Sequence, residues 1–548
     1  MNYCYTFFFR CCLVLGLCFT LSCSQTKENT SANSAPKPNI ILILADDMGF
    51  SDLGAYGGEI NTPSIDKMAD NGLRMTQFYN ASRCCPTRAS LLTGLYPHQA
   101  NMGFMQEDCK LPGYGGFIPN TAVTIAQALK ANGYQTAMSG KWHVGNDPQY
   151  WPTKKGFDKF YGFPHHGGAY FYPFPGDQVV AIGDSLLAHP GEDYYSTEAI
   201  NDYAGKYVRE MAQQEDPFFL YLAHVAPHFP LQARAEDIAK YRGKYKVGFE
   251  KIRQARYEKQ KQLGIIAQDT PLSVVDGLVP EWDKLTEAEK DDYDLRMSIY
   301  AAQIECMDRG IGQLVNTLKE IGEYENTMII FMSDNGGTRE DYSWGDASIP
   351  LGEQGSFGCY KLPWANVSNT PYRMFKHWGH EGGIRTPFIV QYPKMIKAGT
   401  IDNQPAHIVD VMTTFMELAQ GAYPTTYKGH DIQPMEGISL LPVFKGEQRQ
   451  GHDGLFWEHE GNKAARVGDW KWVNIYPEGT DELYNLAEDQ VEQTNLAASN
   501  PEKLQEMKQR WQQWADRVGV QPWEKVIEVE PSQKRLQIWY EHPPQANS

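Results

Sequence analysis

The hydrophobic pattern divides most of the chain into alternating buried strands and amphipathic helices. Five large apolar residues in succession, 40–44, indicate a strand that is buried on both faces, as in a parallel sheet. Alternating strands and helices favour an α/β fold in which a large, mixed but mostly parallel sheet is sandwiched by helices. The other predicted strands span 136–138, 218–222, 328–332 and 388–392, and the predicted helices span 66–71, 121–131, 196–213 and 290–320.

From about residue 453 the pattern changes to short apolar runs that are separated by tight turns. This change predicts a small antiparallel sheet followed by a helix. It divides the folded part into a large domain, 38–452, and a C-terminal subdomain, 453–548. Upstream, charged residues dominate 236–289, which we expect to form an insertion on the surface. The short strands are predicted at 454–458, 464–467, 470–475 and 482–485, and the helix at 500–518.

The N-terminal segment predicts export and attachment to a membrane. Its apolar run, 11–21, is too short for a transmembrane helix and is typical of a signal peptide, here 1–23. Residues 20–24 resemble a bacterial lipoprotein box with Cys23 as the lipidated first mature residue, and a plain secretory signal is the alternative. Residues 24–37 suit a flexible tether. We therefore expect the mature protein in the periplasm or on the cell surface, anchored to the outer envelope membrane by its lipid.

Composition narrows the classes of function. Apolar residues make up 42% of the chain and charged residues 21%, which is typical of a globular protein. The 67 acidic residues outnumber the 50 basic ones and give a net charge of -17, which argues against a nucleic-acid partner. A small anionic substrate stays compatible with this charge, because a site can be locally positive on an acidic protein.

The clearest chemical signal is the segment Ser82–Gly94, SRCCPTRASLLTG. Pro86 suits the first turn of a helix and the final glycine its end, so Cys84 lies just before a helix N-terminus. The helix dipole and free N–H groups there favour negative charge and would activate a nucleophile. Arg88 lies one turn further along and is expected to point back at the same place. This segment, Cys84-x-Pro86-x-Arg88 followed by Ala-Ser-Leu-Leu-Thr-Gly, resembles the signature of the sulfatase family.

The resemblance runs from about residue 38 to the C-terminal sheet and carries several implications. It implies an alkaline phosphatase-like fold and the hydrolysis of sulfate monoesters. It also implies that a formylglycine-forming maturase converts Cys84 to formylglycine, whose gem-diol is the nucleophile. Cys85 occupies a variable position of the signature, and we interpret it as a packing thiol.

Two acidic motifs each follow an apolar strand and suggest a metal site. They are Asp46-Asp47 and Asp334-Asn335. Four hard oxygen side chains suit Ca²⁺ or Mg²⁺ rather than zinc. The resemblance implies that these four bind one Ca²⁺ ion together with the modified Cys84, and that Asp334 helps the nucleophilic hydroxyl to lose its proton.

A lysine and two histidines follow from the same resemblance. Lys141 and His143 are two residues apart, and they would face one side if the segment is extended. The family uses such a pair on the formylglycine hydroxyls and the sulfate oxygens, with the histidine taking a proton from the second hydroxyl. His228 follows a proline at the end of a predicted strand and would protonate the leaving oxygen. His224 is the competing candidate for that role.

A further basic residue comes from the segment before the family's E-G-G-x-R-x-P motif. Lys376 lies six residues before the first glycine of that motif and would bind the sulfate, with His380 as an alternative. Arg88 would share the charge of the sulfate oxygens with the two lysines and the Ca²⁺ ion. Arg385 is expected to brace the loop rather than to touch substrate.

The substrate is the least determined part of the sequence interpretation. An exported, tethered enzyme meets polymers and their fragments, so we expect a sulfated carbohydrate, with sulfated galactose or N-acetylgalactosamine as the narrowest hypothesis. His459, Glu460 and Asn462 would line a carbohydrate pocket, and an ordinary polar turn is the alternative. The run His165-His166-Gly167-Gly168 and Trp344 are open in the same way. Two rival functions are a phosphodiesterase or phosphonate hydrolase of the same superfamily, and a non-enzymatic lipoprotein that captures sulfated glycans.

Overall fold

The structure is a computed structural model that describes residues 37–529, apart from 173, 175–177 and 343–345. The predicted signal peptide, the lipidation site Cys23 and nearly all of the predicted tether lie outside the described residues, so they stay predictions. Trp344 also lies outside them. Within the described part of the chain, no helix combines the length and the apolar character that are needed to cross a membrane.

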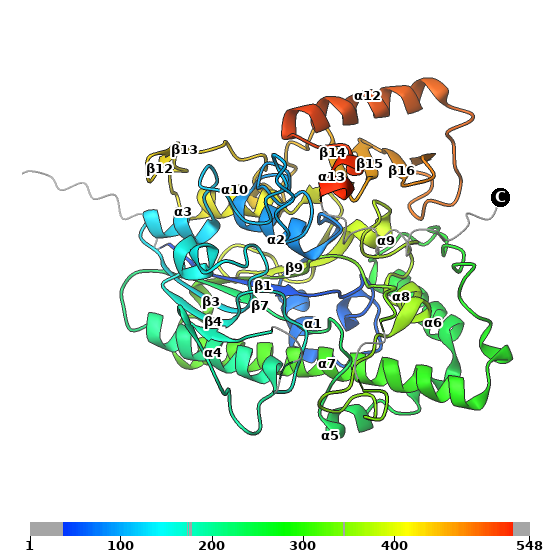
Figure 1. The fold of residues 1–548 in the computed structure, drawn as a ribbon, viewed down its shortest axis with the longest axis horizontal. Coiled ribbons are helices and arrows are strands. Elements are labelled where there is room, and N and C mark those ends of the chain that lie inside the picture. The colour runs from blue at the N-terminus through cyan, green and yellow to red at the C-terminus, as the bar shows by residue number, and fades with distance from the viewer. Residues whose placement is uncertain (1–36, 173, 175–177, 343–345, 530–548) are drawn as a thin grey trace, which may run out of the picture. The chain divides into compact units, whose positions relative to one another are not determined.

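A large mixed sheet of 11 strands forms the centre of the described residues (Figure 1). In spatial order its strands are β10 (Thr400–Asp402), β2 (Leu73–Tyr79), β9 (Arg385–Gln391), β8 (Thr327–Ser333), β1 (Asn39–Ala45), β7 (Phe218–Ala223), β3 (Gln135–Lys141), β4 (Lys159–Phe163), β5 (Ala181–Ile182) and β6 (Ser185–Leu186), with β11 (Ala406–His407) beside β2. The central strands β8, β1, β7, β3 and β4 are parallel, whereas β9 is antiparallel to both β2 and β8. This confirms the predicted mostly parallel sheet.

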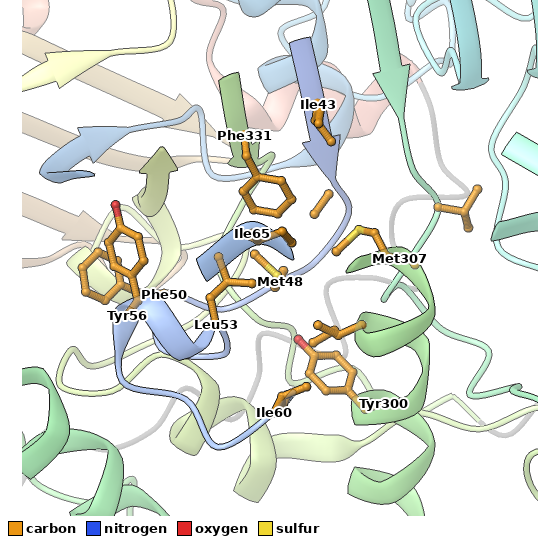
Figure 2. Packing of buried hydrophobic residues seen from close by; sticks show 14 of the residues in the cluster. Ile43, Met48, Phe50, Leu53, Tyr56, Ile60, Ile65, Tyr300, Met307 and Phe331 are labelled. Carbon is orange, nitrogen blue, oxygen red and sulfur yellow. The ribbon is translucent and has the colours of Figure 1, made fainter. Parts of the chain in front are cut away.

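The middle strand β1 shows why a continuous apolar run is needed. Its alternate side chains point to opposite faces, and Ile41 and Ile43 join one hydrophobic core while Ile40, Leu42 and Leu44 join another. Figure 2 shows the first of these cores, in which side chains from β1 and β8 meet those of two helices. Both faces of the sheet are therefore covered.

Two layers of helices cover the sheet, as the sequence pattern predicts. The helices α1 (Pro63–Asp70), α4 (Ser196–Met211) and α7 (Glu287–Glu320) pack in the core that contains Ile43. The helices α2 (Cys84–Thr93), α3 (Ile125–Ala131) and α10 (Asp410–Leu418) pack in the other core, on the opposite face of the sheet (Figure 1). The remaining helices are α5 (Ala235–Ala239), α6 (Phe249–Leu263), α8 (Lys361–Ser368), α9 (Glu381–Ile384), α11 (Leu441–Phe444) and α13 (Trp523–Val529), with 3-10 turns at Gly54–Tyr56, Pro148–Tyr150, Pro152–Lys155, Lys244–Val247, Trp282–Lys284 and Tyr324–Asn326.

The predicted C-terminal sheet is also present. Its four antiparallel strands are β14 (Leu455–His459), β15 (Asn462–Val467), β16 (Trp470–Ile475) and β17 (Thr480–Asn485). Helix α12 (Pro501–Val518) covers it with Trp511 and Trp514, which lie in one core with Trp472. A small hairpin of β12 (Thr426–Tyr427) and β13 (His430–Asp431) precedes this sheet. The exact boundary between the two predicted domains stays a prediction.

The segment 236–289 differs from its expected place on the surface. Its helix α6 has a buried face, and the Arg256 side chain is only 1% exposed. The guanidinium of Arg256 donates to Asp52 Oδ1 at 2.6 Å and to Glu59 Oε2 at 2.7 Å. Because paired carboxylates compensate the buried charge, a charged helix is built into the interior.

The helix predicted at 121–131 begins later, at Ile125. The Thr124 hydroxyl accepts the Gln127 backbone N–H, and the Gln127 side-chain oxygen accepts the Thr124 backbone N–H. This reciprocal capping box fixes the start of α3.

Candidate active site

The sheet topology brings the two predicted acidic motifs together. Strands β1 and β8 are parallel, with Ala45 opposite Ser333, so the residues that follow each strand meet at one edge. The Asn335 amide donates to Asp47 Oδ1 at 2.8 Å. All four predicted metal ligands are at most 1% exposed; they are Asp46, Asp47, Asp334 and Asn335.

Three cationic side chains partly balance these buried carboxylates. Arg88 donates two N–H groups to Asp334 Oδ2, at 2.8 and 3.1 Å. Lys141 Nζ lies 2.5 Å from Asp46 Oδ2, and Lys376 Nζ lies 2.9 Å from Asp47 Oδ2. Burial and the neighbouring carboxylates nevertheless raise the pKa of Asp334 well above its usual value. Another cation at this edge would relieve that repulsion.

The donor set fits a hard divalent cation. Asp46 Oδ1 and Asn335 Oδ1 are buried oxygens without a hydrogen-bond partner. Such orphaned acceptors are rare and costly in a folded interior. Three carboxylates and one amide oxygen are the ligands that Ca²⁺ or Mg²⁺ prefers. The four side chains therefore have both the chemistry and the unmet capacity for such an ion.

Cys84 is the first residue of helix α2, one position further into the helix than predicted. Its helix begins after the extended residue Arg83 and ends at Gly94, whose left-handed φ of 69° closes the last turn. The neighbouring Cys85 thiol, with His143 and Lys141, holds the pKa of the Cys84 thiol well below its usual value despite burial. Cys85 is fully buried, as expected of a packing thiol.

Lys141 and His143 reach the site by a route that the sequence did not predict. Strand β3 ends at Lys141, and His143 has a left-handed φ of 60°, so the premise of an extended segment is wrong. Gly140 allows the close approach of β3 to β7, because a Cβ there would lie 1.8 Å from the Ala223 carbonyl oxygen. Burial and the nearby lysine lower the pKa of His143 to about 3, so its imidazole is neutral.

The positions of the two competing histidines favour His228 over His224. His228 Nε2 lies 3.5 Å from Asp47 Oδ2, and its side chain is 13% exposed. His224 is fully buried, and burial lowers its pKa to about 3. His228 lines the cavity described next, whereas His224 does not.

The same comparison favours Lys376 over His380. His380 Nε2 lies 2.7 Å from Glu482 Oε2 of the C-terminal sheet and points away from the cavity lining. Arg385 donates to Glu381 Oε2 at 3.2 Å and to the Thr76 carbonyl, which agrees with its predicted bracing role.

A cavity of about 770 Å³ is lined by most of the predicted catalytic side chains. This volume lies within the usual range of small-molecule sites. Five residues singled out from sequence line it: Cys84, Lys141, His143, His228 and Lys376. His166, which was left open, also lines it.

Several lining residues were missed by the sequence interpretation. Arg83 directly precedes Cys84, and Phe229 directly follows His228. Their adjacency to predicted residues was therefore an available signal. Glu340 also lines the cavity, four residues after the first glycine of Ser-Asp-Asn-Gly-Gly. Glu107, Tyr342 and Phe357 had no such signal, because only the folded chain brings them to the site.

Arg88 lies beneath this cavity rather than in it. Its guanidinium is fully buried between Asp334, Asp46 and the Lys141 carbonyl oxygen, so its expected share in the charge of the sulfate oxygens would be indirect. It lies among the predicted metal ligands, where it donates to Asp334.

The three residues expected to contact sugar are buried outside the cavity lining. His459, Glu460 and Asn462 are 2%, 1% and 4% exposed. They surround His377, whose Nδ1 lies 3.2 Å from Glu460 Oε2 and whose Nε2 lies 3.1 Å from Asn462 Nδ2. The structure thus places them in a buried cluster around His377, and none of the three lines the cavity.

Comparison with known proteins agrees with this geometry. A model of the sulfatase family matches residues 38–422, and one described as N-sulphoglucosamine sulphohydrolase, C-terminal, matches 372–517. An uncharacterized sulfatase of Schizosaccharomyces pombe is 35% identical over 88% of this chain and 94% of its own length. An arylsulfatase of Klebsiella aerogenes is 36% identical over 75% of this chain and 93% of its own length.

A solved structure extends the comparison to a carbohydrate complex. Ps i-CgsB, solved in complex with k-i-k-neocarrahexaose, is 28% identical and has a TM-score of 0.67. The match covers 92% of this chain and 100% of the Ps i-CgsB chain. The chain belongs to the sulfatase family and is a sulfuric ester hydrolase.

Proposed function

We propose that this sulfatase hydrolyses sulfate monoesters on carbohydrates, with formylglycine derived from Cys84 and one Ca²⁺ ion. The observation that carries the proposal is the meeting of Cys84, Lys141, His143, His228 and Lys376 in one cavity above a buried set of oxygen ligands. Sulfated galactose or N-acetylgalactosamine is the narrowest hypothesis for the sugar. The carbohydrate bound to Ps i-CgsB supports a saccharide substrate.

The cofactors have clear places among these residues. Asp46, Asp47, Asp334 and Asn335 would hold the Ca²⁺ ion, with residue 84 as a further ligand. Formylglycine supplies a nucleophilic oxygen, and the ion supplies positive charge next to it. Arg88 fixes Asp334 through two hydrogen bonds and keeps that ligand in place.

The chain's own residues supply binding and proton transfer. Lys141 and Lys376 both line the cavity and would hold the sulfate oxygens, whose charge grows in the transition state. His228 lies at the cavity wall and would donate a proton to the leaving sugar oxygen. His143 is neutral, so it would accept a proton next to residue 84.

The predicted partners and location belong to the same proposal. Residues 1–23 would carry the export signal, with Cys23 as the lipidation site, so the protein would act outside the cytoplasm while anchored to the outer envelope membrane. A formylglycine-forming maturase would act on Cys84 before that. Sulfated saccharides of glycan polymers would be the substrates met there.

The test is anion release from a panel of sulfated saccharides and one phosphate diester. The enzyme is co-expressed with a maturase, and mass spectrometry of the peptide that contains Cys84 verifies the aldehyde. We expect sulfate release that falls at least about 10⁴-fold in Cys84→Ala. Cys85→Ala is the matched control and should keep most of the activity. Phosphate release without sulfate release, or full turnover by Cys84→Ala, would contradict the proposal.

A further inference from the structure

We propose that Glu340 is a specificity-determining residue, which selects saccharides whose reacting ring carries the sulfate ester as its only charge. This inference rests on the proposed function and adds the class of substrate. Glu340 contributes a carboxylate to the wall of the catalytic cavity, on the same side as Lys376. A sulfatase cavity has to attract anions, so an acidic side chain in its lining requires an explanation.

The carboxylate of Glu340 is held in one orientation. The Thr338 hydroxyl donates to Oε2 at 2.8 Å, and the Tyr342 hydroxyl donates to Oε1 at 3.3 Å. Lys376 Nζ lies 3.2 Å from Oε2, and Arg83 lies 3.6 Å from Oε1. Although burial opposes ionisation, the two cations lower the pKa of Glu340 to about 2. A fixed negative charge is therefore part of the cavity at neutral pH.

Charge matching leaves room for one anion. Among the described lining residues, Lys141 lies 2.5 Å from Asp46, and Lys376 lies 2.9 Å from Asp47. These two lysines are the ones that the proposed function assigns to the reacting sulfate. Arg83, the third cation of the lining, lies within ion-pair distance of Glu340. A second sulfate or a carboxylate on the same ring would thus meet Glu340 rather than a spare cation, and like charges repel strongly in a partly desolvated site.

The surroundings of Glu340 suit the neutral parts of a sugar. The Phe229 ring lies edge-on to the rings of Tyr342 and Phe357, with centroids 5.4 and 5.9 Å away, and all three line the cavity. Such an aromatic wall can cover the apolar face of a sugar ring, while an ionised carboxylate accepts hydrogen bonds from hydroxyl or amide groups. Glu107 adds a second acidic side chain to the lining.

The neighbouring surface is acidic as well. A second depression of about 550 Å³ shares Phe171 with the catalytic cavity. It is lined by four acidic residues and two arginines: Glu192, Asp193, Glu236, Glu353, Arg234 and Arg242. A densely charged polymer would be repelled here too, so the preference for a neutral ring extends beyond Glu340.

The experiment compares two saccharides that differ by one anionic group. Sulfate release by the matured, Ca²⁺-loaded enzyme is measured on a galactose or N-acetylgalactosamine monosulfate and on the same sugar with a second sulfate. We expect kcat/KM for the monosulfate to exceed that for the disulfate at least tenfold. In Glu340→Gln, which keeps the side-chain shape, we expect this ratio to fall at least fivefold. The ratio should also shrink with added salt, because the discrimination is electrostatic.

The controls separate selectivity from stability and from the proposed function itself. Glu325→Gln makes the same charge change at an exposed residue of the turn before β8, at the opposite end of that strand, and should leave the ratio unchanged. Glu107→Gln should lower the ratio as a second, independent variant. Equal kcat/KM for both sugars, or a ratio unaltered in Glu340→Gln, would overturn the inference. If the wild-type enzyme with verified aldehyde released sulfate from no saccharide, the proposed function would fail instead.

Discussion

Lys376 and His377 are neighbours in the chain, yet they belong to two polar clusters of opposite character. Lys376 enters the catalytic cavity and pairs with Asp47. His377 turns into a closed cluster with Glu460 and Asn462. Its backbone has a left-handed φ of 92°, which is uncommon for a residue with a Cβ, and its N–H donates to the Ser82 carbonyl oxygen at 2.8 Å. The left-handed backbone of His377 thus allows the neighbouring side chains of Lys376 and His377 to enter different clusters.

The two clusters differ in their access to the cavity, since the catalytic side chains line it and the buried cluster of His377 does not. Asn462 Oδ1 accepts the Tyr476 backbone N–H at 3.2 Å, so its amide nitrogen has to face His377 Nε2. His377 Nε2 is then a hydrogen-bond acceptor, and the ring proton of His377 lies on Nδ1, which faces Glu460. Both clusters leave buried atoms without a hydrogen-bond partner, Asp46 Oδ1 in the catalytic cluster and His459 Nδ1 in the other. Access to the cavity, rather than unsatisfied chemistry alone, therefore separates the catalytic set from the cluster of His377.

Removal of the divalent cation is expected to have the largest effect and to distinguish the two clusters most clearly. The buried carboxylates of Asp46, Asp47 and Asp334 repel one another without it, whereas the cluster of His377 contains one carboxylate, Glu460, that lies beside two histidines. Exhaustive chelation should lower sulfate release at least about 10³-fold and lower the unfolding temperature by at least about 2 °C. Added Ca²⁺ should restore both, as followed by ion chromatography and calorimetry. An unfolding temperature that is indifferent to chelator and Ca²⁺ would refute the metal site.

The next largest effect is expected for Lys376→Ala. Loss of one group that stabilises transition-state charge should reduce kcat by about 10²–10³-fold. The fold should be little affected, because the cavity admits water to the space that the side chain leaves. The exposed Lys397 offers the matched control, and Lys397→Ala should be as active as wild type. If the free energy of unfolding fell so far that lost folding explained the lost activity, Lys376 would belong to the structural cluster.

The structural cluster is expected to respond in the opposite way. Asn462→Ala removes hydrogen bonds to His377, the His459 carbonyl and the Tyr476 backbone inside a buried turn. We expect a loss of about 1–3 kcal/mol in the free energy of unfolding and a smaller fall in kcat than in Lys376→Ala. Denaturant unfolding and initial rates give the two values. Normal stability with a large rise in KM would restore the sugar contact predicted from sequence.

The sequence was sufficient for the sheet and for the catalytic motifs. The apolar run of β1 requires burial on two faces, and parallel strands place Asp46 and Asp334 at one edge. The place of Arg88 was not accessible, because a guanidinium four residues after Cys84 reaches either a substrate or a buried carboxylate with the same spacing. Glu340 was missed because its role depends on its distance from Lys376, 36 positions away in the chain.

The three residues predicted to contact sugar do not line the cavity, and the sequence could not show this for a related reason. His459, Glu460 and Asn462 have the donors and acceptors of a binding loop. The sequence does not show that the His377 side chain lies among them and contacts Glu460 and Asn462. A local pattern specifies the chemistry of side chains, whereas accessibility is decided by segments that are distant in sequence.

The smallest predicted effect concerns how the structural cluster depends on pH. Although burial raises the pKa of Glu460, the imidazoles of His377 and His459 lower it below its usual value. A carboxylate with a depressed folded-state pKa stabilises the fold above its unfolded pKa of about 4.3, and this stabilisation is lost as the pH falls further. Glu460→Gln should therefore cost about 1–2 kcal/mol at pH 7, and the difference from wild type should narrow below about pH 4.5.

Denaturant unfolding of wild type and Glu460→Gln at pH 7, 5, 4 and 3.5 measures this narrowing. Glu325→Gln is the matched control, since its exposed side chain should give no difference at any of these pH values. A gap that stays constant down to pH 3.5 would show that Glu460 acts through its shape and neutral hydrogen bonds rather than through its charge. The His377 cluster would then be held by packing, and the comparison with the charged catalytic cluster would become sharper still.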